Sequence, residues 1–141
     1  MKTDKSQHPS PPPEAGKAVV YILEDIQTAD LGFKIGGITI RLGLDGSWKG
    51  ATSSNSYLFF TVDPGDHRLC ANWQSSVSGR AKLGSALTLT AEAGKGYFFR
   101  VKVYGLNDRD HPLSVKLEPI DPAEAQFLIS SYALSTAHPK K

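Results

Sequence analysis

The sequence is poor in cysteine, in long apolar runs and in net charge, and each shortage excludes a class of protein. Cys70 is the single cysteine, so the chain has no internal disulfide and no zinc site made of several cysteines. No apolar run reaches the ~18 residues that a membrane-spanning helix needs. The 16 Lys and Arg residues against 14 Asp and Glu residues leave a formal charge of +2, which is too small to indicate nucleic acid or an acidic membrane as a partner.

Turn-forming residues, by contrast, are abundant. The 141 residues include 13 glycines and 9 prolines, and 40% of them are hydrophobic, which is typical of a single globular domain with many turns. The first sixteen residues hold prolines 9, 11, 12 and 13 and have almost no apolar side chains. We therefore expect a disordered Pro/Ser-rich spacer at 1–16, a single domain at 17–134 and a tail at 135–141.

Short apolar segments separated by turn residues predict a series of strands. Residues 18–23 (AVVYIL) are continuously apolar and largely β-branched, which predicts a strand covered on both faces. Apolar side chains alternate along 38–44, and Asp45-Gly46 then supplies the positive φ of a two-residue hairpin turn. After a strand at 57–62, Pro64-Gly65 predicts another tight turn.

The clearest alternation lies in residues 97–103, and further strand patterns lie at 87–91 and 115–117. No helical pattern separates any two of these strands, whereas parallel neighbours need a crossover of a dozen or more residues that is usually helical. We therefore expect a mainly β fold. Its predicted form is an antiparallel β-sandwich (immunoglobulin/transthyretin-like) of about seven or eight strands with one C-terminal α-helix.

The helix is predicted at about 121–133. Asp121 is a suitable N-cap and is followed by proline, which fits the first helical position. Ala125, Leu128, Ile129 and Tyr132 then fall on one apolar stripe. Such a stripe either covers the core of its own domain, which we favour, or docks on another protein.

Several short motifs together resemble one bacterial family. They are GKAVVY (16–21), LDGSWKG (44–50), YLFF (57–60), VDPGDH (62–67), LTL (87–89), GKGYF (94–98) and LEP (117–119). This set resembles the family called domain of unknown function 2846, and the VDPGDH turn is also similar to that of PEGA-type surface modules. The resemblance implies a small β-sandwich of the bacterial cell envelope, often a lipoprotein, in the periplasm or on the outer surface.

The residues themselves leave the location open. No apolar signal segment follows Met1, so the chain is either cytoplasmic or the mature part of a precursor whose signal has been removed. The Pro/Ser spacer favours the second alternative. The resemblance to the envelope family implies a membrane as a partner only through a lipid anchor outside this sequence.

The sequence offers no convincing catalytic, metal or cofactor site. His67 and His111 lie at turns without a third ligand nearby. Glu24 and Asp25 are adjacent on a strand, so their carboxylates point to opposite faces. Cys70 lies within a predicted strand and is expected to be a small buried apolar residue. We therefore expect no catalytic residue, no cofactor and no metal, and we do not expect an enzyme.

One group of side chains points instead to a partner. If the odd-numbered residues of 97–103 face inward, aromatic and cationic side chains face outward, and a tryptophan lies just beyond a hairpin turn. This candidate partner surface consists of Trp48, Phe98, Arg100, Lys102 and Tyr104. The alternative is that a second layer of the chain, such as the C-terminal helix, covers it.

The expected function is a non-catalytic binding or structural module of the bacterial envelope with a protein partner. A small-molecule or glycan-binding domain is the alternative, and a hydrolase is the least favoured class. Residues 95–102 partly match the RNA-recognition octamer, but that fold needs helices between its strands, so we expect no nucleic-acid partner.

Overall fold

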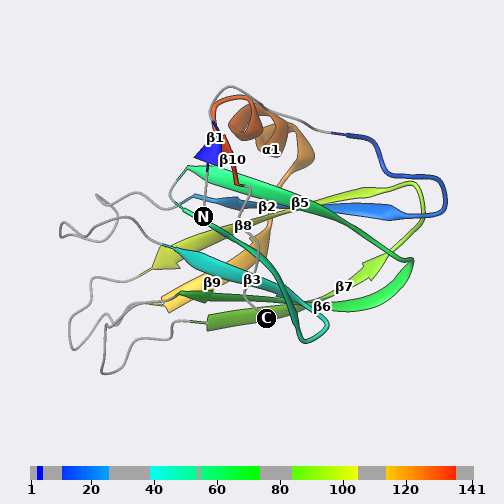
Figure 1. Ribbon diagram of the computed structural model, residues 1–141, viewed down its shortest axis with the longest axis horizontal. Helices are drawn as coiled ribbons and strands as arrows, with labels where there is room; N and C mark the ends of the chain where they lie inside the picture. The colour runs from blue at the N-terminus through cyan, green and yellow to red at the C-terminus, as the bar shows by residue number, and fades with distance from the viewer. Residues whose placement is uncertain are drawn as a thin grey trace.

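The computed structural model describes residues 3–4, 11–25, 39–53, 55–73, 84–104 and 114–135. These residues form two β-sheets and one helix, so the prediction of a mainly β fold is confirmed (Figure 1). The elements are β1 (Thr3–Asp4), β2 (Ala18–Glu24), β3 (Ile40–Leu44), β4 (Ser47–Thr52), β5 (Ser56–Val62), β6 (Gly65–Trp73), β7 (Gly84–Ala91), β8 (Gly96–Tyr104), β9 (Ser114–Pro119), α1 (Pro122–Ile129) and β10 (Ala133–Ser135).

The strands divide between a six-stranded sheet, in the order β1-β10-β5-β2-β8-β9, and a four-stranded sheet, in the order β4-β3-β6-β7. Neither β1 nor β10 is predicted by the sequence, because each is only two or three residues long. Part of the expected spacer lies in this fold, since Thr3 pairs with Ser135 and the Pro11 carbonyl accepts a hydrogen bond from the Tyr21 hydroxyl at 2.8 Å.

Most neighbouring strands are antiparallel, as the sequence predicts, but two pairs are parallel. They are β2 with β8 and β10 with β5. Between β2 and β8 the chain passes through strands of the four-stranded sheet, so that sheet provides the crossover that the sequence argument assigned to a helix. Helix α1 lies between β9 and β10 in the chain and connects the two sides of the six-stranded sheet.

The inward faces of the two sheets share one core. Val20, Ile22 and Val101 of the six-stranded sheet pack in the same cluster as Leu42 and Leu69 of the four-stranded sheet. The alternation of these residues along their strands is the period-two pattern seen in the sequence. The turn predictions are also confirmed: Asp45 and Gly46 have φ values of 51° and 88°, and Gly65 has a φ of 124°.

A second apolar cluster lies on the outer face of the six-stranded sheet, under α1. Strand β2 is therefore buried on both faces, as predicted, since Tyr21 and Leu23 belong to this outer cluster. The Asp121 carboxylate accepts hydrogen bonds from the backbone of Ala123 and Glu124, which confirms it as the N-cap. The helix ends at Ile129, four residues earlier than expected.

The apolar stripe of this C-terminal segment covers the domain's own sheet, the alternative that the sequence favoured. Ile129 of α1 and Tyr132 just beyond it are both buried in the outer cluster. Tyr132 keeps its place on the stripe although it lies outside the helix, because the chain turns at Ser130 and enters β10.

Candidate functional site

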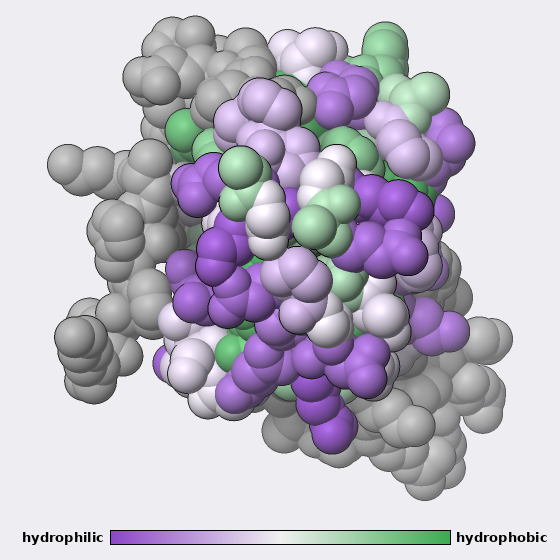
Figure 2. Space-filling view, turned by 90° about the vertical axis from the view of Figure 1, so that its right-hand side faces the viewer, coloured by the Kyte–Doolittle hydropathy of each residue, from purple (hydrophilic) through white to green (hydrophobic). Residues whose placement is uncertain are grey.

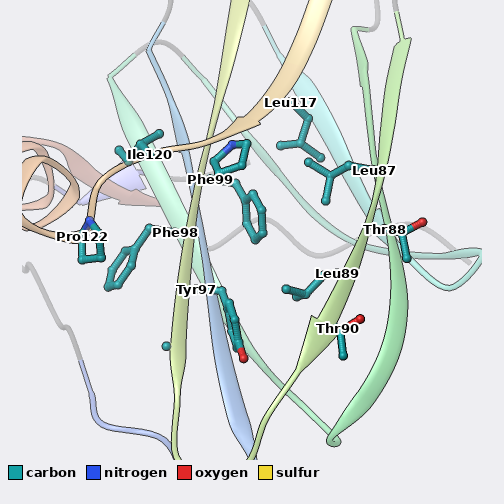
Figure 3. Close-up of a pocket in the computed structure, with 12 residues that line it drawn as sticks. Leu87, Thr88, Leu89, Thr90, Tyr97, Phe98, Phe99, Leu117, Ile120 and Pro122 are labelled. Carbon is teal, nitrogen blue, oxygen red and sulfur yellow. The ribbon is translucent and has the colours of Figure 1, made fainter.

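An apolar groove lies between β7 of one sheet and β8 of the other (Figure 3). It encloses about 550 Å³. In Figure 3, Leu87 and Leu89 point from β7 toward the rings of Tyr97 and Phe99 on β8, whereas Thr88 and Thr90 point away from the groove. The remaining lining residues are Gly96, Phe98, Leu117, Pro119, Ile120 and Pro122.

The groove exists because β9 is shorter than the strand it pairs with. Strand β9 pairs with β8 only from Phe99 onward, since Pro119 is opposite Phe99 and the chain then turns toward α1. The last backbone contact on this side is a 3.0 Å hydrogen bond from the Ile120 N–H to the Phe98 carbonyl. The Gly96 end of β8 therefore has β2 on one side and the groove on the other.

The opposite end of the groove is closed by a contact between the two sheets. The backbone N–H of Leu117 on β9 donates a hydrogen bond of 3.1 Å to the Ser85 hydroxyl on β7. At the other end, beside the turn between β7 and β8, the Tyr97 hydroxyl accepts a 2.9 Å hydrogen bond from the Glu92 N–H. The groove therefore lies between two hydrogen bonds that join the sheets, one at Ser85 and one at the turn between β7 and β8.

The chemistry of the lining is that of a binding surface. Its described residues include no carboxylate, imidazole, amine or thiol, and their polar side-chain groups are the hydroxyls of Thr88, Thr90 and Tyr97. What they supply is apolar area and, on the β7 side, the outer edge of a strand. Such a surface can bind apolar groups of a partner.

The edge of β7 differs from the other sheet edges of the described chain. Strand β4 carries Lys49, β9 carries Lys116 and ends on proline, and β1 is only two residues long. These are common devices against unwanted strand pairing. Strand β7 is eight residues long, carries no charge and no proline, and pairs only with β6 among the described strands.

The candidate partner surface from the sequence is not one continuous surface. Trp48 lies on the four-stranded sheet, with the Arg41 guanidinium 4.3 Å from its ring centroid, while the other members lie on β8. Phe98 is half-buried in the outer cluster and stacks on Tyr21 at a centroid distance of 4.9 Å and an interplanar angle of 11°. It also lines the groove from the α1 side.

Arg100 is held by three carboxylates. Its Nε donates to the Glu118 carboxylate at 2.8 Å, and its Nη1 lies 3.9 Å from Asp25 and 3.7 Å from Glu124. Lys102 is half-buried on the same strand, and the side chain of Tyr104 lies outside the described residues. Arg100 therefore links β8 to β9 and α1.

The adjacent carboxylates of Glu24, the last residue of β2, and Asp25, which follows it, diverge as predicted. The Glu24 carboxylate is fully buried and accepts a 2.9 Å hydrogen bond from the Thr52 hydroxyl. Asp25 accepts a 3.2 Å hydrogen bond from the Tyr132 hydroxyl on the other face, and burial, followed by the Asp25 charge, raises the pKa of Tyr132. Burial likewise raises the pKa of Tyr57 to about 12.

Two further sequence predictions concern single side chains. Cys70 is half-buried on the outer face of the four-stranded sheet and not in the core, because strand alternation places it opposite Leu69 and Ala71. His67 lies near the start of β6, just after the Pro64-Gly65 turn, and His111 lies outside the described residues.

A comparison of the chain with known protein families and with curated proteins finds no match. In the parts of the chain that the structure describes, no helix has the length and apolar character needed to cross a membrane. Nor do these parts bring together three or more histidine, cysteine, aspartate or glutamate side chains in a metal-binding arrangement. The groove and the β7 edge are thus the features on which a functional proposal can be built.

Proposed function

We propose that this chain is a non-catalytic protein-binding module that takes up an extended segment of its partner along the outer edge of β7. The observation behind this proposal is a strand edge that carries no charge and pairs with no other described strand, together with an apolar groove directly beside it. An edge of this kind offers main-chain donors and acceptors to an added strand.

The groove adds selectivity to that pairing. Side chains of an added strand point alternately to its two faces, so every second side chain would enter the space between Leu89, Tyr97 and Phe99. Apolar residues are expected at those positions of the partner, since burial of apolar area supplies ~25 cal/mol per Å². The other side chains of the partner would face solvent beside Thr88 and Thr90 and could be polar.

A second candidate function is the binding of a small apolar molecule in the groove. Its volume of about 550 Å³ lies within the range of ligand pockets. A glycan is less favoured because the lining has few polar side chains to bind hydroxyl groups. For the same reason, a hydrolase remains the least favoured class.

The finer fold class and the location are also part of this proposal. We assign the two sheets to an immunoglobulin- or transthyretin-like β-sandwich, because both inward faces contribute to one core. The periplasmic or outer-surface location and the lipid anchor rest on the resemblance to the envelope family described above. Proteins of the envelope would then supply the extended segment.

Strand addition can be tested with selected peptides. Peptides that bind the purified protein would be isolated from a display library, and each backbone N–H of the best binder would then be methylated in turn. We expect methylation at alternate positions to weaken binding at least about tenfold, because only every second N–H donates to β7. Methylation at the intervening positions should leave the affinity nearly unchanged.

Two protein variants complete this test. Leu87→Lys places a charge in the half-buried wall of the groove and should abolish peptide binding, whereas Thr61→Lys adds the same charge to an exposed position on β5 and should not. Both variants must first show a normal melting transition. An affinity that is insensitive to methylation at every position would reject strand addition, and tight binding of a small apolar dye that competes with no peptide would favour the second candidate.

A further inference from the structure

Three connections of the chain meet at one end of the molecule. They are the turn between β3 and β4, the turn between β5 and β6, and the segment that leads into β2. Figure 2 shows this end face on, with hydrophilic side chains gathered over it. The side chain in contact with two of these connections is His67, at the start of β6.

His67 is held at both ring nitrogens. Its Nδ1 lies 2.6 Å from Oδ2 of Asp45, in the β3–β4 turn, and its Nε2 lies 2.6 Å from the backbone carbonyl oxygen of Asp63, in the β5–β6 turn. The imidazole is only 13% exposed, so it is mostly removed from competing water. Neither acceptor can donate a proton, since one is a carboxylate and the other a carbonyl.

A neutral imidazole has a single N–H and can satisfy only one of these acceptors. Its second nitrogen would then present a lone pair to an oxygen 2.6 Å away, which is repulsive. The imidazolium form has an N–H at each nitrogen and satisfies both. The geometry therefore fits the protonated histidine.

The neighbouring charges are arranged around the same contact. Lys17, just before β2, pairs with the Asp63 carboxylate, and the Asp45 carboxylate also accepts a 2.8 Å hydrogen bond from the Arg68 N–H. Lys49 on β4 acts on Asp45 through its charge. The hydrogen bonds with Asp45 and with the Asp63 carbonyl raise the pKa of His67, and the bond with His67 lowers the pKa of Asp45.

We propose that His67 is a pH-dependent latch: when protonated it holds the β3–β4 and β5–β6 turns together, and when it loses its proton it releases one of them. The latch is closed at and below the ordinary histidine pKa of 6.5, because the folded protein retains the proton beyond that point. The stability that it contributes is fully present below pH 6.5. It is lost as the pH rises through the raised pKa of the folded state.

The first test is nitrogen-15 NMR of the histidine rings in the intact protein. At pH 6.5 an ordinary histidine is about half protonated. We expect His67 at this pH to be more than half protonated, with both ring nitrogens bearing hydrogen in the major form. A half-protonated His67 at pH 6.5, or a neutral ring with one bare nitrogen, would overturn the proposal.

Two variants separate the latch from general charge effects. Asp45→Asn removes the carboxylate but keeps its size, and should move the His67 titration down toward pH 6.5. Asp66→Asn is the matched control, because Asp66 lies next to His67 but accepts its hydrogen bond from the Thr90 hydroxyl. It should leave the titration nearly unchanged. Equal shifts in both variants would show that net charge, and not the Asp45 contact, sets the proton affinity.

The release itself is measured by amide exchange. The Arg68 N–H donates to Asp45, so its exchange reports on the β3–β4 turn. The Lys17 amine pairs with the Asp63 carboxylate, so NMR of this amine reports on the β5–β6 turn. Exchange rates are corrected for the intrinsic effect of pH. Between pH 6.5 and a pH above the His67 titration, we expect hydrogen exchange at the Arg68 amide or at the Lys17 amine to become at least about threefold faster. A titration that leaves both unchanged would overturn the latch.

Discussion

Replacement of Phe98 by alanine tests whether the aromatic side chains of β8 belong to the domain or serve a partner. The ring stacks on the buried Tyr21 at 4.9 Å and packs in the cluster under α1. Full burial of a phenylalanine corresponds to ~3–5 kcal/mol on truncation to alanine. Because Phe98 is half-buried, and because its stacking contributes ~0.5–1.5 kcal/mol, we expect Phe98→Ala to lower the free energy of unfolding by about 2 kcal/mol.

The assay is urea denaturation followed by circular dichroism, with the same slope assumed for wild type and variant. Phe127 is the matched control, since it lies on α1 with 74% of its surface exposed. Phe127→Ala should change the free energy of unfolding by less than ~0.5 kcal/mol. If the two variants are equally stable, Phe98 is not part of the outer cluster, and its prediction as a partner residue regains support.

Three further predictions concern the core, the helix and the tyrosines. Val101→Asp places a carboxylate at a fully buried core position and should abolish cooperative unfolding in a thermal melt, whereas a transition at the wild-type temperature would refute the assignment of the inward face. Asp121→Ala removes two hydrogen bonds at the N-cap and should lower the free energy of unfolding, measured by urea denaturation, by ~1 kcal/mol. An unchanged free energy of unfolding would mean that α1 adds nothing to stability. In an alkaline absorbance titration, Tyr57 should ionise near pH 12. The free energy of unfolding should fall above pH 10, because the unfolded chain releases this proton first, and Tyr57→Phe should remove that part of the fall. Ionisation of Tyr57 near pH 10 in the native protein would show that the ring is not buried.

The local features of the fold follow from the sequence because they depend on neighbouring residues. Asp45-Gly46 and Gly65 adopt positive φ since few other residues do so at low cost, and Asp121 caps α1 through its own short side chain. The continuous apolar character of β2 indicates burial on both faces, and both clusters are present. These signals lie within a few residues of the structure that they predict.

Pairing between distant strands has no such signal. The parallel contact of β2 with β8 depends on how the intervening strands return from the second sheet, and the short β10 reaches β5 after the chain has passed through α1, which packs on the outer face. The groove was missed for the same reason, since it arises where β9 ends opposite Phe99. One signal could have indicated it: residues 84–91 lack the charges and prolines that most exposed strand edges carry.

The role of His67 also required the fold. Its position after a Pro-Gly turn is visible in the sequence, but Asp45 lies twenty-two residues earlier and reaches it only because β3 pairs with β6. Likewise, alternation placed Phe98 and Arg100 on an outward face but gave no information about what covers that face. Phe98 is covered by the outer cluster, and Arg100 by ion pairs with β9 and α1.

Hydrogen–deuterium exchange along β7, with and without a selected peptide, tests whether a partner strand adds to the outer edge of β7. In the free protein, alternate amides of residues 87–91 should exchange quickly, because they point away from β6 and have no strand partner in the described chain. If a peptide strand adds to this edge, the same amides should exchange at least about tenfold more slowly in the complex, together with those at the Gly96 end of β8. Protection that appears only on β4 or on the outer face of α1, with β7 unchanged, would contradict it.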